Sequence, residues 1–293
     1  PRPPMSRKLW NAQAAIFSIF FWSASFTWTK LALLELNPWS LAFWRWLCAA
    51  LFFAFYLPLR GQGPQVQQAL RRDGWRLALL GLLGVSLTYG LQNIGLTRTT
   101  AINSSLIMSS IGLLTALLGV AWLGERLHRR GWLGLALAFS GMVVIVGQGA
   151  ALTVGASTLP GDLIMTAAAL CAALYSIYGK PLVARTPPAV MTGLVAGFGA
   201  LFLLPAALWQ GLALPGPLQT WALLLALGIG SSALANLAWW QMLSRLDASR
   251  AGLFLFLIPV VASLIAVITL GETLTLQTIG GALLVLGGVY LAG

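Results

Sequence analysis

The sequence has few charged residues and very few acidic ones. Of its 293 residues, 8% are charged, six are Asp or Glu, and one is His. A water-soluble domain of this length needs about a quarter of its residues charged to cover its surface, so an ordinary soluble fold is excluded. The two cysteines, Cys48 and Cys171, lie in apolar runs without the spacing of a metal site or a redox motif. We interpret them as core or lipid-facing thiols.

Acidic residues are absent from the interior of the long apolar runs. All six lie at the ends of these runs or between them: Glu35, Asp73, Glu125, Asp162, Asp247 and Glu272. Proton-driven carriers usually place an acidic residue or a histidine deep in the bilayer as a relay. Without one, we expect a substrate to move down its own gradient. An intramembrane enzyme is also disfavoured, because it needs a nucleophile with a base or a metal inside the membrane. We therefore expect no catalytic residue, no metal and no cofactor.

Apolar residues make up 59% of the chain and occur in long runs. A helix needs about 20 apolar residues to cross the hydrocarbon of a bilayer. The sequence predicts ten such spans, near residues 10–33, 39–59, 75–96, 100–122, 131–149, 161–182, 189–211, 218–240, 249–270 and 276–292. The predicted fold class is an all-α integral membrane protein with ten transmembrane helices.

The positive residues behind the net charge of +11 are unevenly distributed between the two ends of these predicted spans. With a cytoplasmic N-terminus, one side of the membrane collects Arg2, Arg7, Lys8, Arg60, Arg71, Arg72, Arg76, Arg126, Arg129, Arg130, Lys180, Arg185, Arg245 and Arg250. The other side and the span ends near it keep Lys30, Arg45 and Arg98. This is the positive-inside pattern. It predicts that both termini are cytoplasmic, and it removes the reason to expect a nucleic-acid partner.

The second half of the chain repeats the first. Residues 123–127 (LGERL) return as residues 270–274 (LGETL), at an offset of 272 − 125 = 147. The earlier spans align at 180 − 30 = 150, which relates Lys30 to Lys180. The sequence thus predicts four segments: an N-terminal tail at 1–9, a first five-helix repeat at 10–149, a linker loop at 150–160 and a second five-helix repeat at 161–293.

An odd number of spans in each repeat predicts that the two repeats are inverted relative to each other. Inverted repeats are typical of transporters that alternate access around a site near the midplane. A duplication without moving parts is the alternative. A channel or a receptor ranks lower, because neither explains an inverted repeat.

Polar and aromatic residues within the spans are the candidates for a substrate cavity. The two offsets relate Tyr89 to Asn236, Asn93 to Trp240 and Ser25 to Tyr175, with one of each pair toward each side. The predicted cavity residues are Trp22, Ser25, Tyr89, Gln92, Asn93, Ser105, Tyr175, Tyr178, Asn236, Trp239 and Trp240. Hydroxyls that bond their own helix carbonyls are one alternative, and an interfacial aromatic belt is another. Gln92 is the hardest to explain as packing.

Other residues suit the scaffold better. Gly112 stands where the second repeat has Pro259, and we expect both to be hinge positions, since proline permits a kink. A static kink is the equal alternative. Glu125 and Glu272 are expected to fix helix ends or to pair with arginines. Arg45 and Lys30 either snorkel to the interface or attract a carboxylate. Glycines of the fifth and tenth spans suit close helix contact at the periphery: Gly134, Gly141, Gly147, Gly281 and Gly288.

The region from 245 to 293 resembles the repeat of the drug/metabolite transporter superfamily, and most closely its EamA-type ten-helix exporters. The motifs that carry the resemblance are Pro259, Leu270-Gly271-Glu272, Gln277 and the glycine pairs at 280–281 and 287–288. The first half fits through Trp22, Lys30, Pro38, Arg45 and Gly124-Glu125. The aromatic-rich spans are similar to those of bacterial aromatic amino acid exporters. The resemblance implies a multi-pass protein of the bacterial cytoplasmic (inner) membrane.

The expected substrate follows from the cavity residues. Aromatic rings stack on a flat side chain and hold an ammonium group, while amides and hydroxyls bind polar groups. We expect export of aromatic and other hydrophobic amino acids by alternating access, facilitated rather than proton-coupled. The alternative is a carrier of another metabolite, such as a nucleotide sugar, vitamin, organic cation or drug. The expected partners are the small-molecule substrate and the lipid bilayer, and no sequence feature predicts an oligomeric state.

Overall fold

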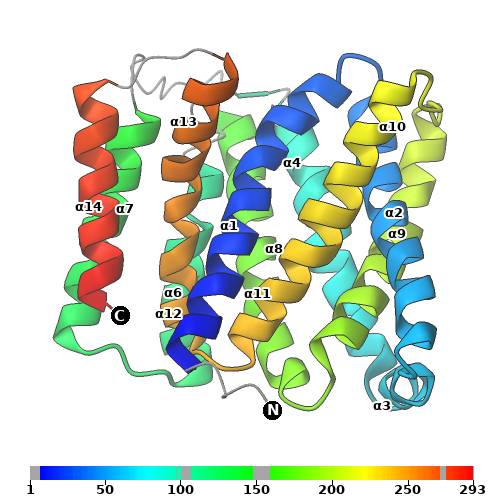
Figure 1. Cartoon of the computed structure of the whole chain (residues 1–293), viewed down its shortest axis with the longest axis horizontal. Coiled ribbons are helices and arrows are strands. Elements are labelled where there is room, and N and C mark those ends of the chain that lie inside the picture. The colour runs from blue at the N-terminus through cyan, green and yellow to red at the C-terminus, as the bar shows by residue number, and fades with distance from the viewer. Residues whose placement is uncertain (1–6, 97, 100–106, 148–158, 271–274, 293) are drawn as a thin grey trace.

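The computed structural model describes residues 7–96, 98–99, 107–147, 159–270 and 275–292, with backbone alone for 7–15, 26, 30, 96, 266, 269 and 270. Regular structure within these ranges is entirely helical (Figure 1). In chain order the elements are α1 (Arg7–Ala32), α2 (Pro38–Leu59), α3 (Gly63–Gly81), η1 (Leu82–Leu87), α4 (Thr88–Leu96), α6 (Ile111–Leu123), α7 (Arg129–Val146), α8 (Leu159–Val183), α9 (Pro188–Trp209), α10 (Leu218–Leu225), η2 (Ala226–Leu234), α11 (Ala235–Leu243), α12 (Ala248–Leu255), α13 (Leu257–Leu270) and α14 (Leu276–Ala292).

Most of these helices have the length and composition of membrane spans. Among the described residues, seven helical runs are long and apolar enough to cross a membrane, and two shorter apolar helices, Ile107–Leu123 and Leu276–Ala292, accompany them. The predicted all-helical membrane fold is therefore confirmed. The count of ten spans and the cytoplasmic placement of the termini stay predictions.

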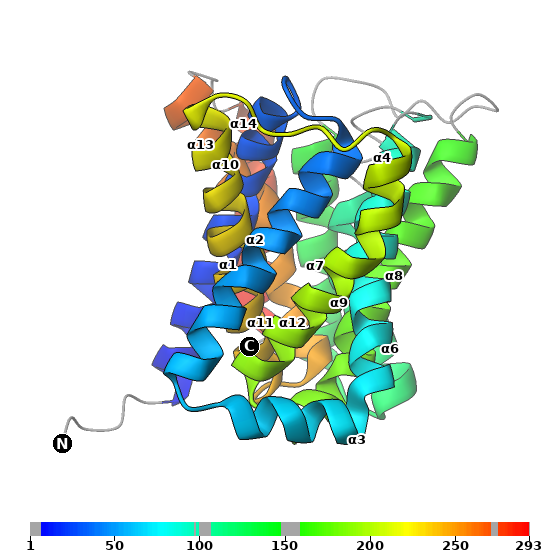
Figure 2. The same cartoon turned by 90° about the vertical axis from the view of Figure 1, so that its right-hand side faces the viewer.

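The helices form a bundle with two distinguishable faces. The turns α2–α3, α6–α7, α8–α9 and α11–α12 lie together at the lower face in Figures 1 and 2. These turns hold Arg60, Arg126, Arg185 and Arg245, so we call this side the basic face. The turns α1–α2 and α9–α10 lie at the opposite face (Figure 1).

Helix bounds recur at the two offsets found in the sequence. α2 and α9 start 188 − 38 = 150 residues apart and end 209 − 59 = 150 apart. α4 and α11 start 235 − 88 = 147 residues apart and end 243 − 96 = 147 apart. α2 and α9 also pack against each other and run in opposite directions (Figure 2).

Two π-helical segments interrupt the bundle at related places. η1 precedes α4 and η2 precedes α11, and their last residues differ by 234 − 87 = 147. A π-turn displaces backbone carbonyls from the normal i→i−4 pattern. Side chains bond to several of these carbonyls: the Thr88 hydroxyl donates to Leu83 O at 2.7 Å, and the Asn236 amide donates to Ser232 O at 3.0 Å. Such segments occur often at functional sites.

The first part of α3 lies across the basic face instead of crossing the bundle (Figure 2). Its turn into the bundle falls at Asp73, whose φ and ψ of −130° and 16° are not helical. The buried Asp73 carboxylate receives guanidinium groups from Arg72 at 2.7 Å, Arg76 at 3.2 Å and Arg185 at 2.6 Å. The sequence predicted a span from residue 75 but not the surface helix before it, because the apolar-run criterion sees only the crossing part.

α7 and α14 pack together at one edge of the bundle (Figure 1). A Cβ atom added to Gly134 would lie 2.5 Å from Gly288 O, and one added to Gly141 would lie 2.5 Å from Gly281 O. Any larger side chain would force these backbones apart. The predicted close contact of the fifth and tenth spans is therefore confirmed for Gly134, Gly141, Gly281 and Gly288, whereas an atom added to Gly147 would meet only Val143 O of its own helix.

Candidate functional site

A buried aromatic pair joins α8 to α11 in the interior. The Trp240 indole Nε1 donates a hydrogen bond to the Tyr175 hydroxyl at 2.8 Å, and the two ring centroids are 4.7 Å apart. Trp240 has no exposed surface, and Tyr175 is buried as well. An aromatic pair with a satisfied N–H and O–H is a stable interior contact. We call these two residues the Tyr175–Trp240 pair.

Two glycines make room for this pair. A Cβ added to Gly179 would lie 2.0 Å from the Trp240 ring, and one added to Gly84 would lie 2.2 Å from the Tyr175 ring. Gly179 is one helical turn after Tyr175 on α8, so both residues of α8 face α11. The sequence prediction missed these glycines. The i, i+4 spacing of Tyr175 and Gly179 was the available signal, but many glycines in spans share such spacings.

Trp239 and Asn236 are buried beside the pair. Trp239 packs against Trp22 of α1, with ring centroids 5.7 Å apart. The Ser23 hydroxyl fastens α1 further, since it donates to Ile258 O at 3.0 Å. The Asn236 amide bonds to two carbonyls of η2, Ser231 O and Ser232 O. Its donor group is therefore used by the π-helix.

Tyr178 is separated from this buried group. It is 46% exposed and its ring lies 5.7 Å from that of Trp122, which is also exposed. A tyrosine–tryptophan contact on an exposed helix surface is typical of lipid-facing or interfacial aromatics.

Tyr89 is the centre of a second cluster, formed with α2. The guanidinium carbon of Arg45 lies 5.1 Å from the centroid of the Tyr89 ring, within the range of a cation–π contact. The Trp46 ring meets Tyr89 edge-on at 5.7 Å. Trp46 is buried, and its indole N–H has no hydrogen-bond partner within the described residues.

The remaining predicted residues toward the opposite face have separate local contacts. The Asn93 amide donates to Pro38 O at 3.2 Å, and the Ser25 hydroxyl donates to Trp22 O of its own helix at 2.7 Å. Gln92 is half-buried and lies three residues after Tyr89, on a neighbouring part of the α4 surface. Ser105 lies outside the described residues.

Arg45, like Trp46, is an interior residue that the predicted cavity set omitted. It is 6% exposed, and it donates from Nε to the Ser232 hydroxyl at 2.6 Å and from Nη2 to the Ser231 hydroxyl at 2.8 Å. A snorkelling side chain would have an exposed head group, so that alternative for Arg45 is wrong. The signal was present as a single arginine inside the apolar run of the second span. The Lys30 side chain is not among those described.

Glu125 closes a contact between the halves at the basic face. Its carboxylate accepts from the backbone N–H groups of Ala248 and Ser249, both at 2.7 Å, and thereby caps the start of α12. Lys180 Nζ lies 3.2 Å from the same carboxylate. The predicted helix-end role of Glu125 is confirmed, with Lys180 as its cation in place of an arginine. Glu272 is outside the described residues.

The environment of Glu125 favours its ionised form. Burial acts to raise its pKa, but hydrogen bonds from Ser249 and Ala248 and the charge of Lys180 outweigh burial. The net result is a Glu125 pKa below the usual value for this side chain. The contact is therefore an ion pair at neutral pH.

The two predicted hinge residues lie beside helix breaks. Phe256 separates α12 from α13, three residues before Pro259. Ser110 forms a turn immediately before α6, two residues before Gly112. Gly112 is also a packing residue, since an added Cβ would lie 2.6 Å from Gly252 O. Hinge motion at either place stays a prediction.

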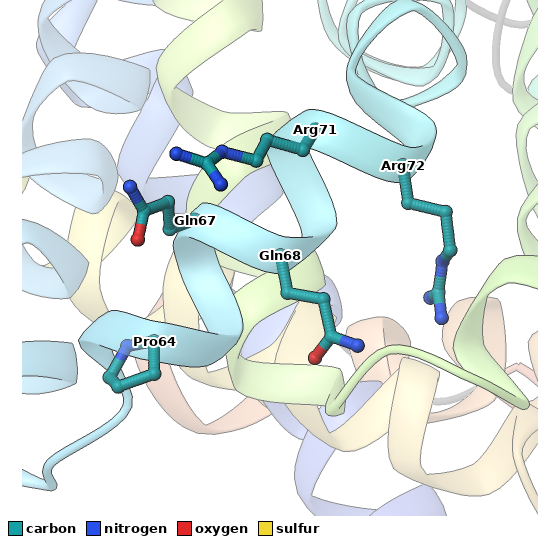
Figure 3. Close-up of a pocket in the computed structure, with 5 residues that line it drawn as sticks. All are labelled: Pro64, Gln67, Gln68, Arg71 and Arg72. Carbon is teal, nitrogen blue, oxygen red and sulfur yellow. The ribbon is translucent and has the colours of Figure 1, made fainter.

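An open pocket of about 430 Å³ lies on the surface helix of the basic face. Figure 3 shows its lining residues Pro64, Gln67, Gln68, Arg71 and Arg72 on successive turns of α3. None of the predicted cavity residues contributes to it. In the described part of the chain, His, Cys, Asp and Glu form no group of three or more that could hold a metal ion.

The described chain is thus a helical membrane bundle whose two halves are joined by buried aromatic and polar contacts. The chain belongs to the EamA-like transporter family, whose model matches twice, at residues 9–147 and 159–293. The predicted resemblance to this branch of the drug/metabolite transporter superfamily is confirmed.

Similar proteins give the same class. A protein named "Uncharacterized transporter" from Archaeoglobus fulgidus is 31% identical over 94% of this chain and 94% of its own length. A "Probable terminal-alkyne amino-acid exporter" from Streptantibioticus cattleyicolor is 29% identical over 97% of this chain and 92% of its own. A "Probable amino-acid metabolite efflux pump" from Salmonella typhimurium is 28% identical over 98% and 95%. A solved crystal structure covers 96% of both chains with a TM-score of 0.85 at 22% identity, which supports the fold.

Proposed function

We propose that this transporter exports aromatic and other hydrophobic amino acids through a cavity between its two halves. The observation that carries the proposal is the cluster of Arg45, Trp46 and Tyr89, which combines an interior cation with aromatic walls. An amino acid with a flat side chain needs both kinds of partner. Two relatives named for amino-acid export support the amino-acid part of the proposal. The aromatic preference is inferred from the cluster.

The proposed cavity residues fall into two groups. Tyr89, Gln92 and Asn93 lie on α4 toward the opposite face. The Tyr175–Trp240 pair, with Trp239 and Trp22, lies closer to the basic face. We propose that the basic face is cytoplasmic, in agreement with the positive-inside pattern. Substrate would then meet the aromatic pair on its cytoplasmic side first.

The contacts of the basic half suit a closed cytoplasmic gate. The Tyr175–Trp240 pair fills the interior between α8 and α11, and Glu125 ties the end of α6 to Lys180 and α12. Alternating access would exchange this state for one in which these contacts separate. The matching helix bounds of the two halves support such an exchange.

Transport is proposed to be facilitated and not proton-coupled. The six acidic residues of the chain all lie outside the interior of the predicted spans, so the spans contain no carboxylate relay of the kind that proton-driven carriers use. Net direction then follows the substrate gradient. Uphill accumulation of substrate in liposomes under an imposed proton gradient would contradict this part of the proposal.

The test is transport by purified protein in liposomes with radiolabelled phenylalanine or tryptophan. We expect saturable uptake without a proton gradient, and a lower rate for Gln92→Ala and for Trp240→Ala. Trp209→Ala is a matched control, because Trp209 is 91% exposed at the end of α9. Flux no higher than in empty liposomes would reject the amino-acid substrate and favour another metabolite, such as a nucleotide sugar, vitamin, organic cation or drug.

A further inference from the structure

Arg45 carries a positive charge in the interior without a carboxylate partner among the described residues. No Asp or Glu of the described chain lies within ion-pair distance of its guanidinium group, and the two hydroxyl partners carry no charge. A buried and unpaired charge is expensive, and within a membrane span it marks a functional residue by default. This charge therefore needs an anion that the described chain does not supply.

We propose that Arg45 binds the carboxylate of the transported amino acid. The inference rests on the proposed function and deepens it, since it assigns the residue that distinguishes an amino acid from its uncharged or cationic analogues. Ser231 and Ser232 of η2 position the guanidinium group, and Tyr89 provides the surface over which it lies.

The geometry leaves donors for such a ligand. A guanidinium group has five N–H donors, and Arg45 uses one on Nε and one on Nη2. Nη1 makes no hydrogen bond to any described residue. A carboxylate accepts two parallel hydrogen bonds from one guanidinium group, so the remaining donors suffice to bind it.

A purely structural role explains Arg45 less well. Arg45 bonds to serines of the π-helical segment η2. The first half contains a related π-helical segment, η1. In the second half, the residue related to Arg45 lies at 45 + 150 = 195 and is Val195. Val195 is buried, and its side chain is uncharged. The related segment therefore forms without an arginine, and a π-helix at this place does not require one.

The neighbours of Arg45 suit the rest of an amino acid. Tyr89 presents an aromatic ring beside the guanidinium group, and Trp46 adds a second ring at 5.7 Å. The buried Trp46 N–H lacks a partner among the described residues and is a further donor for a substrate oxygen. A buried donor without an acceptor is costly, and the same ligand would satisfy both side chains.

The test compares phenylalanine with phenylalaninamide, which lacks the carboxylate, in the liposome assay. In competition, the half-saturation concentration of native protein for phenylalanine should be about 10- to 100-fold lower than for phenylalaninamide. This is the usual effect of a charge-assisted hydrogen bond. Arg45→Gln should raise the half-saturation for phenylalanine by a similar factor, leave that for phenylalaninamide within about twofold, and abolish the preference. Ser231→Ala, which removes one positioning bond but keeps the charge, should retain most of the preference.

The outcomes separate this inference from the proposed function. If native protein transports phenylalanine but Arg45→Gln keeps the full preference over the amide, Arg45 does not bind the carboxylate although the function stands. If native protein transports neither compound, the proposed function itself fails. If Arg45→Gln does not fold, Arg45→Met, which also removes the charge and fills a similar volume with apolar atoms, replaces it in the same comparison. Arg45→Met should abolish the preference for phenylalanine over the amide, and a full preference in this variant would overturn the inference.

Discussion

The two halves of the chain place very different residues at related positions. Tyr175 and Trp240 in the second half correspond to Ser25 and Asn93 in the first, at offsets of 175 − 25 = 150 and 240 − 93 = 147. The large pair is buried and joined by a hydrogen bond. The small pair makes separate bonds, to Trp22 O and to Pro38 O. Related backbone positions thus carry a side-chain hydrogen bond between Tyr175 and Trp240 in the second half. In the first half, Ser25 and Asn93 bond to backbone carbonyls instead of to each other.

This difference predicts that the Tyr175–Trp240 pair stabilises its contact more than Ser25 and Asn93 stabilise theirs. A buried aromatic side chain removes about 150–250 Å² from water, which contributes roughly 4–6 kcal/mol at about 25 cal/mol per Å², whereas the hydrogen bond of a serine or asparagine to a backbone carbonyl contributes about 1 kcal/mol. The Tyr175–Trp240 contact is therefore the stronger one, and the proposed exchange of states would have to separate it.

The first prediction removes the large side chain. Trp240→Ala should lower the free energy of unfolding by about 3–5 kcal/mol, because it leaves a cavity beside Tyr175 and Gly179. The measurement is thermal unfolding in detergent, with the exposed Trp209→Ala as control. A midpoint unchanged relative to the control would mean that the pair does not stabilise the closed basic side.

The second prediction leaves both aromatic residues in place and removes their space. Gly179→Ala puts a methyl group within 2.0 Å of the Trp240 ring, so the ring must move, at a cost of about 1–3 kcal/mol. Gly197→Ala in α9 is the matched control, since an added Cβ there has nothing within 4 Å. Both thermal unfolding and tryptophan fluorescence report the change. Equal behaviour of the two variants would contradict the packing derived from the structure.

The third prediction concerns the ion pair at the basic face. Glu125→Gln should cost about 1–2 kcal/mol, because the amide cannot accept from both Ala248 and Ser249 as the carboxylate does. The Glu125 pKa is lowered in the folded state. The ionised carboxylate therefore contributes fully to the free energy of unfolding above its pKa in the unfolded chain, which is about 4.3. This contribution is lost as the pH falls through the pKa of Glu125 in the folded state.

The midpoint of thermal unfolding, measured in detergent from pH 7 downward, checks this dependence. Native protein should lose stability below about pH 4.3, and the difference between native protein and Glu125→Gln should shrink over the same range. Gln219→Ala, an exposed change at the opposite face, is the control. A constant difference across the range would show that the carboxylate charge at position 125 does not stabilise the fold.

The sequence predicted those parts that depend on repetition and apolar length. The helical membrane fold, the offsets of 147 and 150, the glycine contact of α7 with α14 and the helix-end role of Glu125 all have local or periodic signals. The π-helices had none, since their bonds depend on Thr88, Asn236 and neighbouring helices. The partners of Arg45 were equally hidden, because Ser231 and Ser232 are more than 180 residues away in the chain. Contacts between spans that are distant in the sequence can be found only once the packing of the helices is known.

The corner at Asp73 has a mechanical consequence. Asp73 belongs to the first half, but one of its three guanidinium partners, Arg185, lies in the α8–α9 turn of the second half, and Arg72 also donates to Arg185 O at 3.0 Å. Any relative displacement of the halves must break these bonds or carry the surface segment of α3 along with α8 and α9. If transport follows the proposed alternating access, its moving bodies therefore need not divide where the two sequence repeats divide.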